Sequence, residues 1–159
     1  MDCEIREFVL ADTEAIAGLS AEFVEYLTDL GDPAPRGMSA DEIRRDGFGS
    51  DPAFQGIVAE AERRVIGYLL HHPGYDIDRG GRIWYVIDLF VTASARRNGV
   101  GRALMARARR MCQEAGGRAL VWTVYPPNVV AVRFYRQLGA TISDDRLMTW
   151  PTTAAIAEG

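Results

Sequence analysis

The residues of this chain best suited to binding chemistry lie between positions 96 and 102, where arginines and glycines occur close together. They are Arg96, Arg97, Asn98, Gly99, Val100, Gly101 and Arg102. This segment follows an apolar run that ends at Val91, and a helical pattern starts near Gly99. The first turn of a helix has free N–H groups and the positive end of the helix dipole, and glycine lets a ligand approach the backbone closely. The segment therefore predicts a site for an anion such as a pyrophosphate.

Two other phosphate-binding motifs do not match this segment. A dinucleotide fingerprint needs a third glycine and a place in the first βαβ unit, whereas this segment lies in the middle of the chain. A P-loop needs a lysine, but all 18 basic residues of the chain are arginine. The absence of lysine also excludes a lysine Schiff base. The structural alternative to a ligand site is that Gly99 and Gly101 only permit a tight turn from strand to helix.

Length and composition indicate a globular protein with one domain. The chain has 159 residues, of which 48% are hydrophobic and 25% charged. We expect one domain over residues 1–150 and a tail of small residues over 151–159. No run approaches the roughly 18 apolar residues of a membrane helix, residues 1–6 do not resemble a signal peptide, and Cys3 and Cys112 have neither disulfide-framework nor metal-ligand spacing. By elimination we expect a cytoplasmic protein without a metal or a membrane partner.

The charge of the chain is unevenly distributed. The formal net charge of −4 argues against general affinity for nucleic acid, yet residues 96–110 contain six arginines and no acid. A local basic patch on an acidic chain suits a small polyanionic ligand better than a duplex. A nucleic-acid surface formed by Arg102, Arg107, Arg109 and Arg110 stays as an alternative, although no stacking aromatics are interleaved with these arginines. We therefore expect no nucleic-acid partner.

Hydrophobic periodicity predicts strands and helices that alternate in groups. Strands are expected over residues 4–9, 55–60, 65–70, 83–91, 119–125 and 147–150. Helices are expected from Asp12 to about residue 30, from a capping box at Ser39 and Glu42 to just before Gly47, from Gly99 to about residue 115, and over residues 128–138. A polar loop is expected over residues 73–82. The order β-α-α-β-β-β-α-β-α-β indicates a mixed α/β architecture built in layers.

Two motifs in this order resemble the acetyl-CoA signature of the Gcn5-related N-acetyltransferase (GNAT) superfamily. The first is Arg96-x-x-Gly99-x-Gly101 after Leu89-Phe90-Val91, and the second comprises Asn128, Ala131, Phe134-Tyr135 and Leu138-Gly139-Ala140. The resemblance implies a mixed, largely antiparallel central sheet flanked by helices, which is the acyl-CoA N-acyltransferase fold, and acetyl-CoA as co-substrate. It assigns cofactor contacts to Leu89, Phe90, Val91, all residues from 96 to 102, Asn128, Ala131 and Phe134. In this scheme the backbone of residues 97–102 holds the pyrophosphate, and that of residues 89–91 pairs with the pantetheine arm.

Acetyl transfer from a thioester to an amine needs an acid for the leaving thiolate and a base for the protonated amine. By resemblance Tyr135 is the acid, since a phenol with an ordinary pKa of ~10 can protonate a thiolate with a pKa of ~8.5; the alternative is an aromatic pair with Phe134 in a core. Asp88 is the candidate base because burial in an apolar strand would raise its pKa; the alternative is a carboxylate that accepts backbone N–H groups. His71 and His72 are adjacent and therefore point to opposite faces of a strand, so one of them could face the acceptor. The alternative is that the two histidines are exposed to solvent or hydrogen-bonded in a structural role.

Further segments resemble the diamine branch of this superfamily, which includes the spermidine/spermine and thialysine acetyltransferases. They include Arg45-Asp46-Gly47-Phe48-Gly49, Gly67-Tyr68 and Tyr75-Asp76. Relatives in this branch carry glutamates in the acceptor groove where this chain has Leu27, Ile87 and residues 121–123, although Tyr26 and Asp88 fit their pattern. We therefore expect a small primary amine with less positive charge than a polyamine, held by Tyr26, Ile87, Trp84 and Trp122. A true polyamine acetyltransferase and a non-catalytic CoA-binding sensor or assembly module stay as alternatives, and the branch also implies a homodimer.

Overall fold

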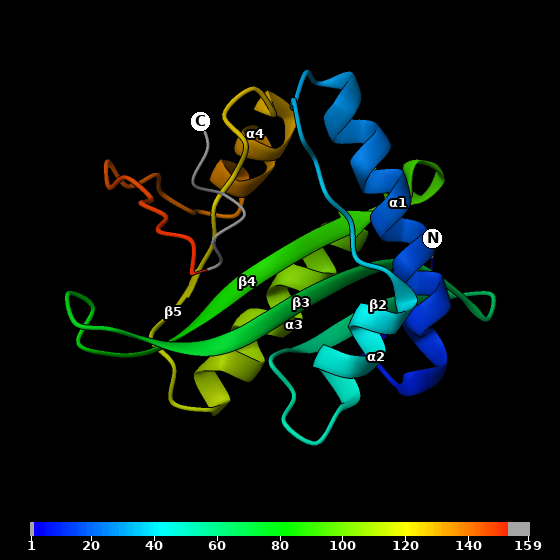
Figure 1. Cartoon of the computed structure of the whole chain (residues 1–159), viewed down its shortest axis with the longest axis horizontal. Helices are drawn as coiled ribbons and strands as arrows, with labels where there is room; N and C mark the ends of the chain where they lie inside the picture. Colours follow the sequence, from blue (N-terminus) through cyan, green and yellow to red (C-terminus); the bar gives the residue numbers. More distant parts are fainter. Residues whose placement is uncertain (1, 153–159) are drawn as a thin grey trace.

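The computed structural model describes residues 2–152, which form one five-stranded sheet with helices on both faces (Figure 1). The strands are β1 (Glu4–Glu7), β2 (Gln55–Ala61), β3 (Arg64–Asp76), β4 (Gly81–Val91) and β5 (Ala119–Val121). The helices are α1 (Thr13–Asp29), α2 (Ala40–Phe48), α3 (Val100–Glu114) and α4 (Val129–Gln137), with short 3-10 turns η1 (Leu10–Asp12) and η2 (Ala93–Ala95). The strand order is β1-β2-β3-β4-β5, and every pair is antiparallel except β4 with β5. The predicted mixed, largely antiparallel sheet flanked by helices is confirmed.

The two faces of the sheet bury separate hydrophobic clusters, because successive residues of a strand point to opposite sides. In β3, Leu69 faces α3 while Leu70 faces α1 and α2, and both are fully buried. The cluster under α3 includes Ile57, Leu69, Val86, Val100, Leu104 and Ala108. The cluster under α1 and α2 includes Ile16, Ile43, Val58, Tyr68, Leu70 and Phe90. The central strands are thus buried on both faces, as the apolar run that ends at Val91 predicts.

The polar segment over residues 73–82 belongs to a long hairpin, so the prediction of a loop there is wrong. β3 and β4 stay paired as far as Asp76 and Gly81. The carboxylate of Asp76 accepts a hydrogen bond from the Arg79 N–H and forms an ion pair with the Arg79 guanidinium, which closes the turn. Tyr75 is 70% exposed because the hairpin extends past the helices (Figure 1). The polar composition reflects solvent around the hairpin, while the backbone ladder continues.

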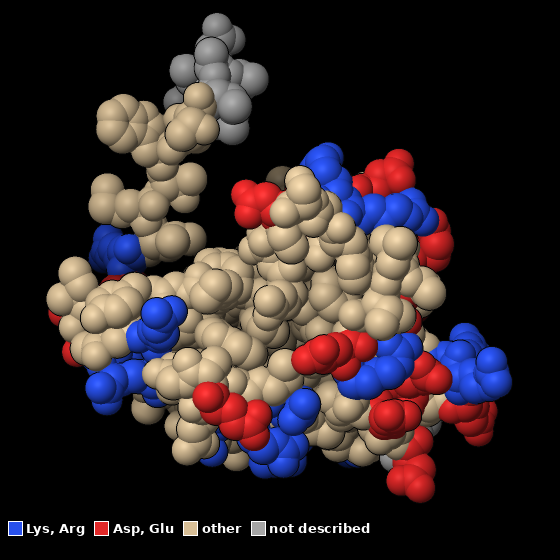
Figure 2. Space-filling view, turned by 90° about the horizontal axis from the view of Figure 1, so that it is seen from below, with Lys and Arg blue, Asp and Glu red and all other residues tan. Residues whose placement is uncertain are grey.

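The strand predicted over residues 147–150 is also wrong. The described residues after α4 have no regular structure, and β5 ends at Val121 rather than near residue 125. The apolar side chains of Leu147, Met148 and Trp150 are 79%, 91% and 94% exposed. Figure 2 shows this stretch projecting from the body of the molecule. An apolar segment forms a strand only where another strand pairs with it, and no described strand of this chain pairs with residues 147–150. The predicted tail lies outside the described residues from residue 153 on.

Local signals at the helix starts are confirmed in part. The Ser39 Oγ accepts the Glu42 N–H at 3.2 Å and the Glu42 carboxylate accepts the Ser39 N–H at 2.9 Å, so the predicted capping box is present. The helix it opens continues one residue past Gly47. Asp12 occupies the N-cap of α1, but its carboxylate forms an ion pair with Arg6 at 2.7 Å instead of capping the helix. Short-range signals therefore place the helix starts well even where a side chain finds a different partner.

Candidate active site

β4 and β5 diverge and leave one edge of β4 uncovered. β5 pairs with β4 only from Ile83 to Tyr85. Beyond Tyr85, β4 continues to Val91 with no described strand on that side, and Figure 1 shows the chain after β5 turning away toward α4. An open edge presents backbone N–H and C=O groups to which an extended ligand with amide groups can add. We call this edge of β4, from Val86 to Val91, the opening, because no strand among the described residues pairs with it and the chain that leads to α4 diverges from it.

The pairing of β4 with β3 decides which backbone groups face this opening. The Thr92 N–H donates to the Ile66 oxygen at 3.0 Å, so these two residues form a hydrogen-bonded pair. Hydrogen-bonded and non-hydrogen-bonded pairs alternate along an antiparallel ladder. The N–H and C=O groups of Val91 and Leu89 therefore point away from β3 and toward the opening, while those of Phe90 bond to β3.

A β-bulge in β4 decides which side chains face the opening. Leu70 pairs with Asp88 but His71 pairs with Val86, so Ile87 is the extra residue of β4. Without this extra residue, Val86 and Asp88 would share one face of the sheet. With it, Val86 lies in the cluster under α3 and Asp88 lies on the face covered by α1 and α2. Ile87 itself is 40% exposed at the bulge.

Asp88 is half-buried beside a tyrosine of the neighbouring strand. The Tyr68 hydroxyl donates to Asp88 Oδ2 at 2.5 Å, and Tyr68 is fully buried. Burial raises the pKa of Asp88 to about 6, although hydrogen bonds from Tyr68 and from the Leu89 N–H act in the opposite direction. Such a carboxyl is ionised at neutral pH and still basic enough to hold a proton, which is the property required of a general base.

Tyr135 lies on α4, which follows the chain that diverges from β4. Its ring packs against the rings of Trp122 and Phe134, with centroid distances of 4.9 Å and 5.1 Å. Burial raises the pKa of Tyr135 to about 12, and the negative charge of Asp88 contributes to this increase. Tyr135 therefore carries its proton at neutral pH and lies close enough to Asp88 to be influenced by its charge. Tyr135 packs against the cluster under α3, whereas the Asp88 carboxylate faces Tyr68 on the other side of the sheet, so the charge of Asp88 reaches Tyr135 without a direct hydrogen bond.

The turn between β4 and α3 has a backbone suited to an anion. Arg97 and Gly99 have φ values of 65° and 82°, and α3 begins at Val100. Gly99 is the N-cap and provides no side-chain hydrogen bond, so the N–H groups of the first turn are not capped by it. A Cβ on Gly101 would lie 3.3 Å from Cζ of Phe134, so α4 packs close to this turn. The exposed side chains next to these N–H groups are those of Arg97, Asn98 and Arg102.

The side chain of Arg96 is directed away from this turn. Its Nε donates to the Val91 oxygen at 2.9 Å. Its guanidinium lies 4.7 Å from the ring centroid of Tyr26 and 5.0 Å from that of Phe90. A guanidinium between two aromatic rings is stabilised by cation–π attraction. Arg96 thus ties the end of β4 to α1, and the backbone with Arg97 and Arg102 is left to contact an anion.

Asn128 joins α1 to α4 across the opening. It is 6% exposed, and its Oδ1 accepts the Ala131 N–H at 3.1 Å, which caps α4. The same oxygen accepts the Tyr26 hydroxyl at 3.0 Å. Tyr26, predicted on the acceptor side, and Asn128, predicted on the cofactor side, are therefore in direct contact.

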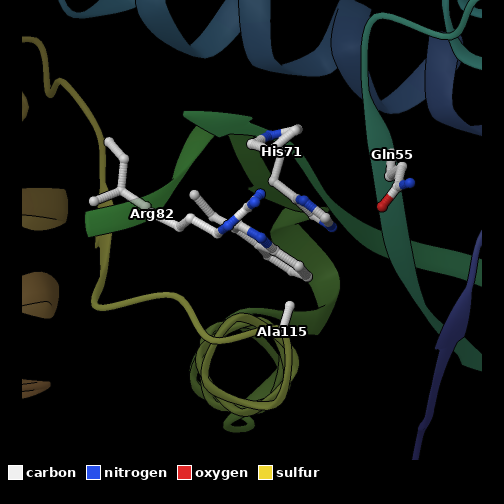
Figure 3. A pocket seen from close by; sticks show the side chains of 7 residues that line it. Gln55, His71, Arg82 and Ala115 are labelled. Atoms are coloured by element: carbon white, nitrogen blue, oxygen red, sulfur yellow. The ribbon is translucent and has the colours of Figure 1, made fainter. Parts of the chain in front are cut away.

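Trp84 does not lie with these residues. Its ring stacks on His71 at a centroid distance of 3.9 Å, in a cavity of about 230 Å³ between the sheet and the end of α3 at Ala115. Figure 3 shows His71 and Arg82 at this cavity, with the end of α3 below them. The bulge puts this pair on the face of the sheet opposite to Asp88. His71 is 1% exposed, neither of its nitrogens has a hydrogen-bond partner among the described residues, and burial lowers its pKa to about 4.

Sequence reasoning did not single out Tyr68 as a site residue. A tyrosine in an otherwise apolar stretch of a strand, paired with the strand that carries Asp88, is a signal that could have identified it. In residues 2–152 no group of three or more His, Cys, Asp or Glu side chains is arranged to hold a metal ion. No helix among these residues is long and apolar enough to span a bilayer.

Known proteins resemble this chain in both sequence and fold. The model of the acetyltransferase (GNAT) family matches residues 19–140. A thialysine N-epsilon-acetyltransferase from Bos taurus is 30% identical over 144 residues, which cover 86% of this chain and 82% of the relative. An L-ornithine N5-acetyltransferase from Arabidopsis thaliana is 31% identical over 78 residues, 49% of this chain and 34% of the relative. The solved structure of an integron cassette protein from V. cholerae has a TM-score of 0.77 at 22% identity, and the match covers 97% of this chain and 94% of that one.

Fold, opening and comparisons agree on the class of protein. The chain belongs to the acetyltransferase (GNAT) family and is an N-acetyltransferase. Its relatives include thialysine N-epsilon-acetyltransferases and a spermidine/spermine N(1)-acetyltransferase-like protein, as the sequence motifs predict.

Proposed function

We propose that this protein transfers the acetyl group of acetyl-CoA to the primary amine of a small molecule by direct attack of the amine on the thioester. The observation that carries this proposal is the opening along β4, which leads from the first turn of α3 to Asp88 and Tyr135. The uncapped first turn of α3 supports a pyrophosphate site, and the raised pKa values of Asp88 and Tyr135 support roles as base and acid. Acetyl-CoA supplies the activated acetyl group as a thioester.

The residues around the opening fit this co-substrate. Of the backbone groups that face the opening, the Leu89 and Val91 oxygens would accept the amide N–H groups of the pantetheine arm as an added strand does. The N–H groups of the first turn of α3, with Arg97 and Arg102, would hold the pyrophosphate. Gly101 leaves room for it beside Phe134. Asn128 and Ala131 would line the same path at the start of α4.

Three groups of this chain would act on the reacting atoms. The Asp88 carboxylate would take a proton from the ammonium form of the acceptor. The Val91 N–H would polarise the thioester carbonyl, an interaction that typically contributes ~10²–10³ in rate. Tyr135 would give its proton to the leaving sulfur and regain one from the nitrogen of the new amide. Because the charge of Asp88 raises the pKa of Tyr135, protonation of Asp88 by the amine makes Tyr135 a stronger acid when the sulfur leaves.

The test is thiol release from acetyl-CoA with a panel of primary amines. Turnover that depends on the amine supports the proposal. Binding of CoA without turnover on any amine would favour the alternative of a sensor or assembly module. Asp88→Asn should lower kcat, whereas an unchanged kcat would remove Asp88 from the base role.

We also propose that the acceptor carries less positive charge than a polyamine and resembles an amino acid with a side-chain amine. The relatives named above act on thialysine and L-ornithine by their names. Around the opening Tyr26, Ile87 and Trp122 are aromatic or aliphatic, so one carboxylate, Asp88, would meet the amine. A panel in which only spermidine and spermine react would contradict this assignment.

A homodimer and a cytoplasmic location complete the proposal. The apolar side chains at Leu147, Met148 and Trp150 and the second edge of β5 are free in the described chain. Exposed apolar groups and a free strand edge each favour association with another copy. The molar mass in solution tests the dimer, and fractionation of the producing cells tests the location.

A further inference from the structure

Tyr68 is a buried polar side chain that the proposed chemistry has not yet used. It lies on β3 in the cluster under α1 and α2, and it is 0% exposed. A hydroxyl buried among apolar side chains is costly unless it is hydrogen-bonded. Its donor bond to Asp88 Oδ2, at 2.5 Å, satisfies this requirement.

A second layer of contacts holds Tyr68 from behind. Ser20 of α1 is 2% exposed and lies beside the Tyr68 hydroxyl. Burial and the charge of Asp88 raise the pKa of Tyr68, so the hydroxyl keeps the proton that it donates to Asp88. The Ser20 Oγ also accepts the Met38 N–H at 2.9 Å. A Cβ on Gly37 would lie 3.0 Å from this oxygen, so the chain between α1 and α2 packs directly on Ser20. Contacts therefore run from this connection through α1 and β3 to Asp88.

We propose that Tyr68 is the positioning residue of the general base, because it holds Oδ2 of Asp88 and leaves Oδ1 to receive the proton of the amine. This inference rests on the proposed function, in which Asp88 is the base. Ser20 and the connection between α1 and α2 hold the Tyr68 hydroxyl in turn. Tyr68 does not touch the substrate.

Loss of the Tyr68 hydroxyl would change the pKa of Asp88. The groups that hydrogen-bond this carboxyl are the Tyr68 hydroxyl from β3 and the Leu89 N–H from its own strand, and the charge of the carboxyl acts on Tyr135 of α4. Tyr68, Tyr135 and Ser20 are uncharged at neutral pH. Burial raises the pKa of Asp88, and the hydrogen bonds from Tyr68 and from the Leu89 N–H lower it. Without the Tyr68 hydroxyl only the Leu89 N–H lowers this pKa, so the pKa of Asp88 must rise.

The experiment compares the wild type with Tyr68→Phe, which removes the hydroxyl and keeps the ring. The acidic limb of the kcat/KM pH profile should move up by about one to two pH units, the effect of losing one hydrogen bond to a charged group. At neutral pH kcat should fall while KM for acetyl-CoA changes little. Tyr75→Phe on the same strand is the matched control, since Tyr75 is 70% exposed and remote from the opening, and it should leave the profile unchanged.

A second measurement separates this inference from the proposed function. Titration of the Asp88 carboxyl by ¹³C NMR needs no turnover, and its midpoint should rise in Tyr68→Phe and not in Tyr75→Phe. An unmoved midpoint and an unmoved acidic limb overturn the positioning role even if the enzyme is active. If the wild type acetylates no amine, the proposed function fails, and the positioning role fails with it, while the NMR midpoint still reports the contact.

Folding of the variant is checked by thermal unfolding. If Tyr68→Phe does not fold, Ser20→Ala takes its place because it leaves Tyr68 intact and removes the group behind it. The Asp88 midpoint should then rise by a smaller amount. No rise in Ser20→Ala overturns the proposal.

Discussion

His71 should make the stability of this protein depend on pH between about 4 and 6.5. Its ring is 1% exposed and stacked on Trp84, and its nitrogens have no partner among the described residues. Burial is the largest cause that lowers its pKa, to about 4, and the charge of His72 adds to this. A histidine in the unfolded chain has a pKa of ~6.5. Because the folded-state pKa is depressed, the unfolded state binds the proton first, so stability is present above pH ~6.5 and is lost as pH falls toward 4.

The size of the effect follows from these two pKa values. At pH 7.5 both states hold His71 neutral and the linkage is close to zero. At pH 5 the unfolded state is almost fully protonated at this position and the folded state is not, which lowers the free energy of unfolding by about 2 kcal/mol. A chain of this size has an m-value of roughly 2 kcal/mol/M in urea, so the midpoint should fall by about 1 M.

Asp88 acts in the opposite direction over the same range. Its folded-state pKa is raised to about 6, so protonation on the way down to pH 5 favours the folded state. The pH dependence of the wild type alone therefore does not isolate His71. The informative quantity is the difference between the wild type and His71→Phe, which keeps an aromatic ring on Trp84 and removes the titrating nitrogens.

Urea unfolding at pH 7.5 and pH 5 measures this difference. The loss of stability between the two pH values should be about 2 kcal/mol smaller in His71→Phe than in the wild type. His72→Phe is the matched control, because His72 is the other histidine of the chain, sits next to His71 and is more exposed. If His71→Phe loses as much stability as the wild type on acidification, the reasoning about a buried neutral imidazole is refuted.

Three further predictions concern the opening and the assembly. Tyr135→Phe should lower kcat at least ~10²-fold with little change in the Kd for CoA, and equal kcat would end its assignment as the acid. Gly101→Val should weaken CoA binding at least ~10-fold, measured by calorimetry, because its Cβ would lie 3.3 Å from Phe134 and its methyl groups would cover the first turn of α3; Gly18→Ala, which meets no atom within 4 Å, is the control and should bind CoA normally. Trp150→Ser should shift the molar mass in light scattering toward that of a monomer, and a dimer as stable as the wild type would exclude this stretch from the interface.

The features that follow from neighbouring residues were predictable from the sequence. The capping box at Ser39 needs only residues that are three positions apart. The turn into α3 was predictable because Gly99 adopts a positive φ at little cost and the apolar run of β4 precedes it. The paired motifs of residues 96–101 and 128–140 were enough to predict the family and the fold. The prediction of a strand at residues 147–150 was wrong for the opposite reason, since a strand needs a partner strand from a distant part of the sequence.

The arrangement of the site was decided by the tertiary structure. The sequence predicts Trp84 and Asp88 as neighbours of one acceptor pocket, but the bulge at Ile87 turns them to opposite faces of the sheet. Arg96 belongs to the anion motif by sequence, yet its guanidinium lies over the ring of Tyr26 and donates to the backbone oxygen of Val91. These two partners come within reach of Arg96 only in the folded chain.

By itself, then, the sequence determined the class of enzyme, the order of its elements as far as α4 and the loop that would hold a pyrophosphate. Only the tertiary structure decided that the Asp88 carboxylate accepts a hydrogen bond from the Tyr68 hydroxyl. Tyr68, Asp88 and Tyr135 come from two strands and a helix that are distant in the chain. Their distances, burial and charges depend on one extra residue in β4 and on the packing of α1 and α4 around it, and no local pattern encodes these.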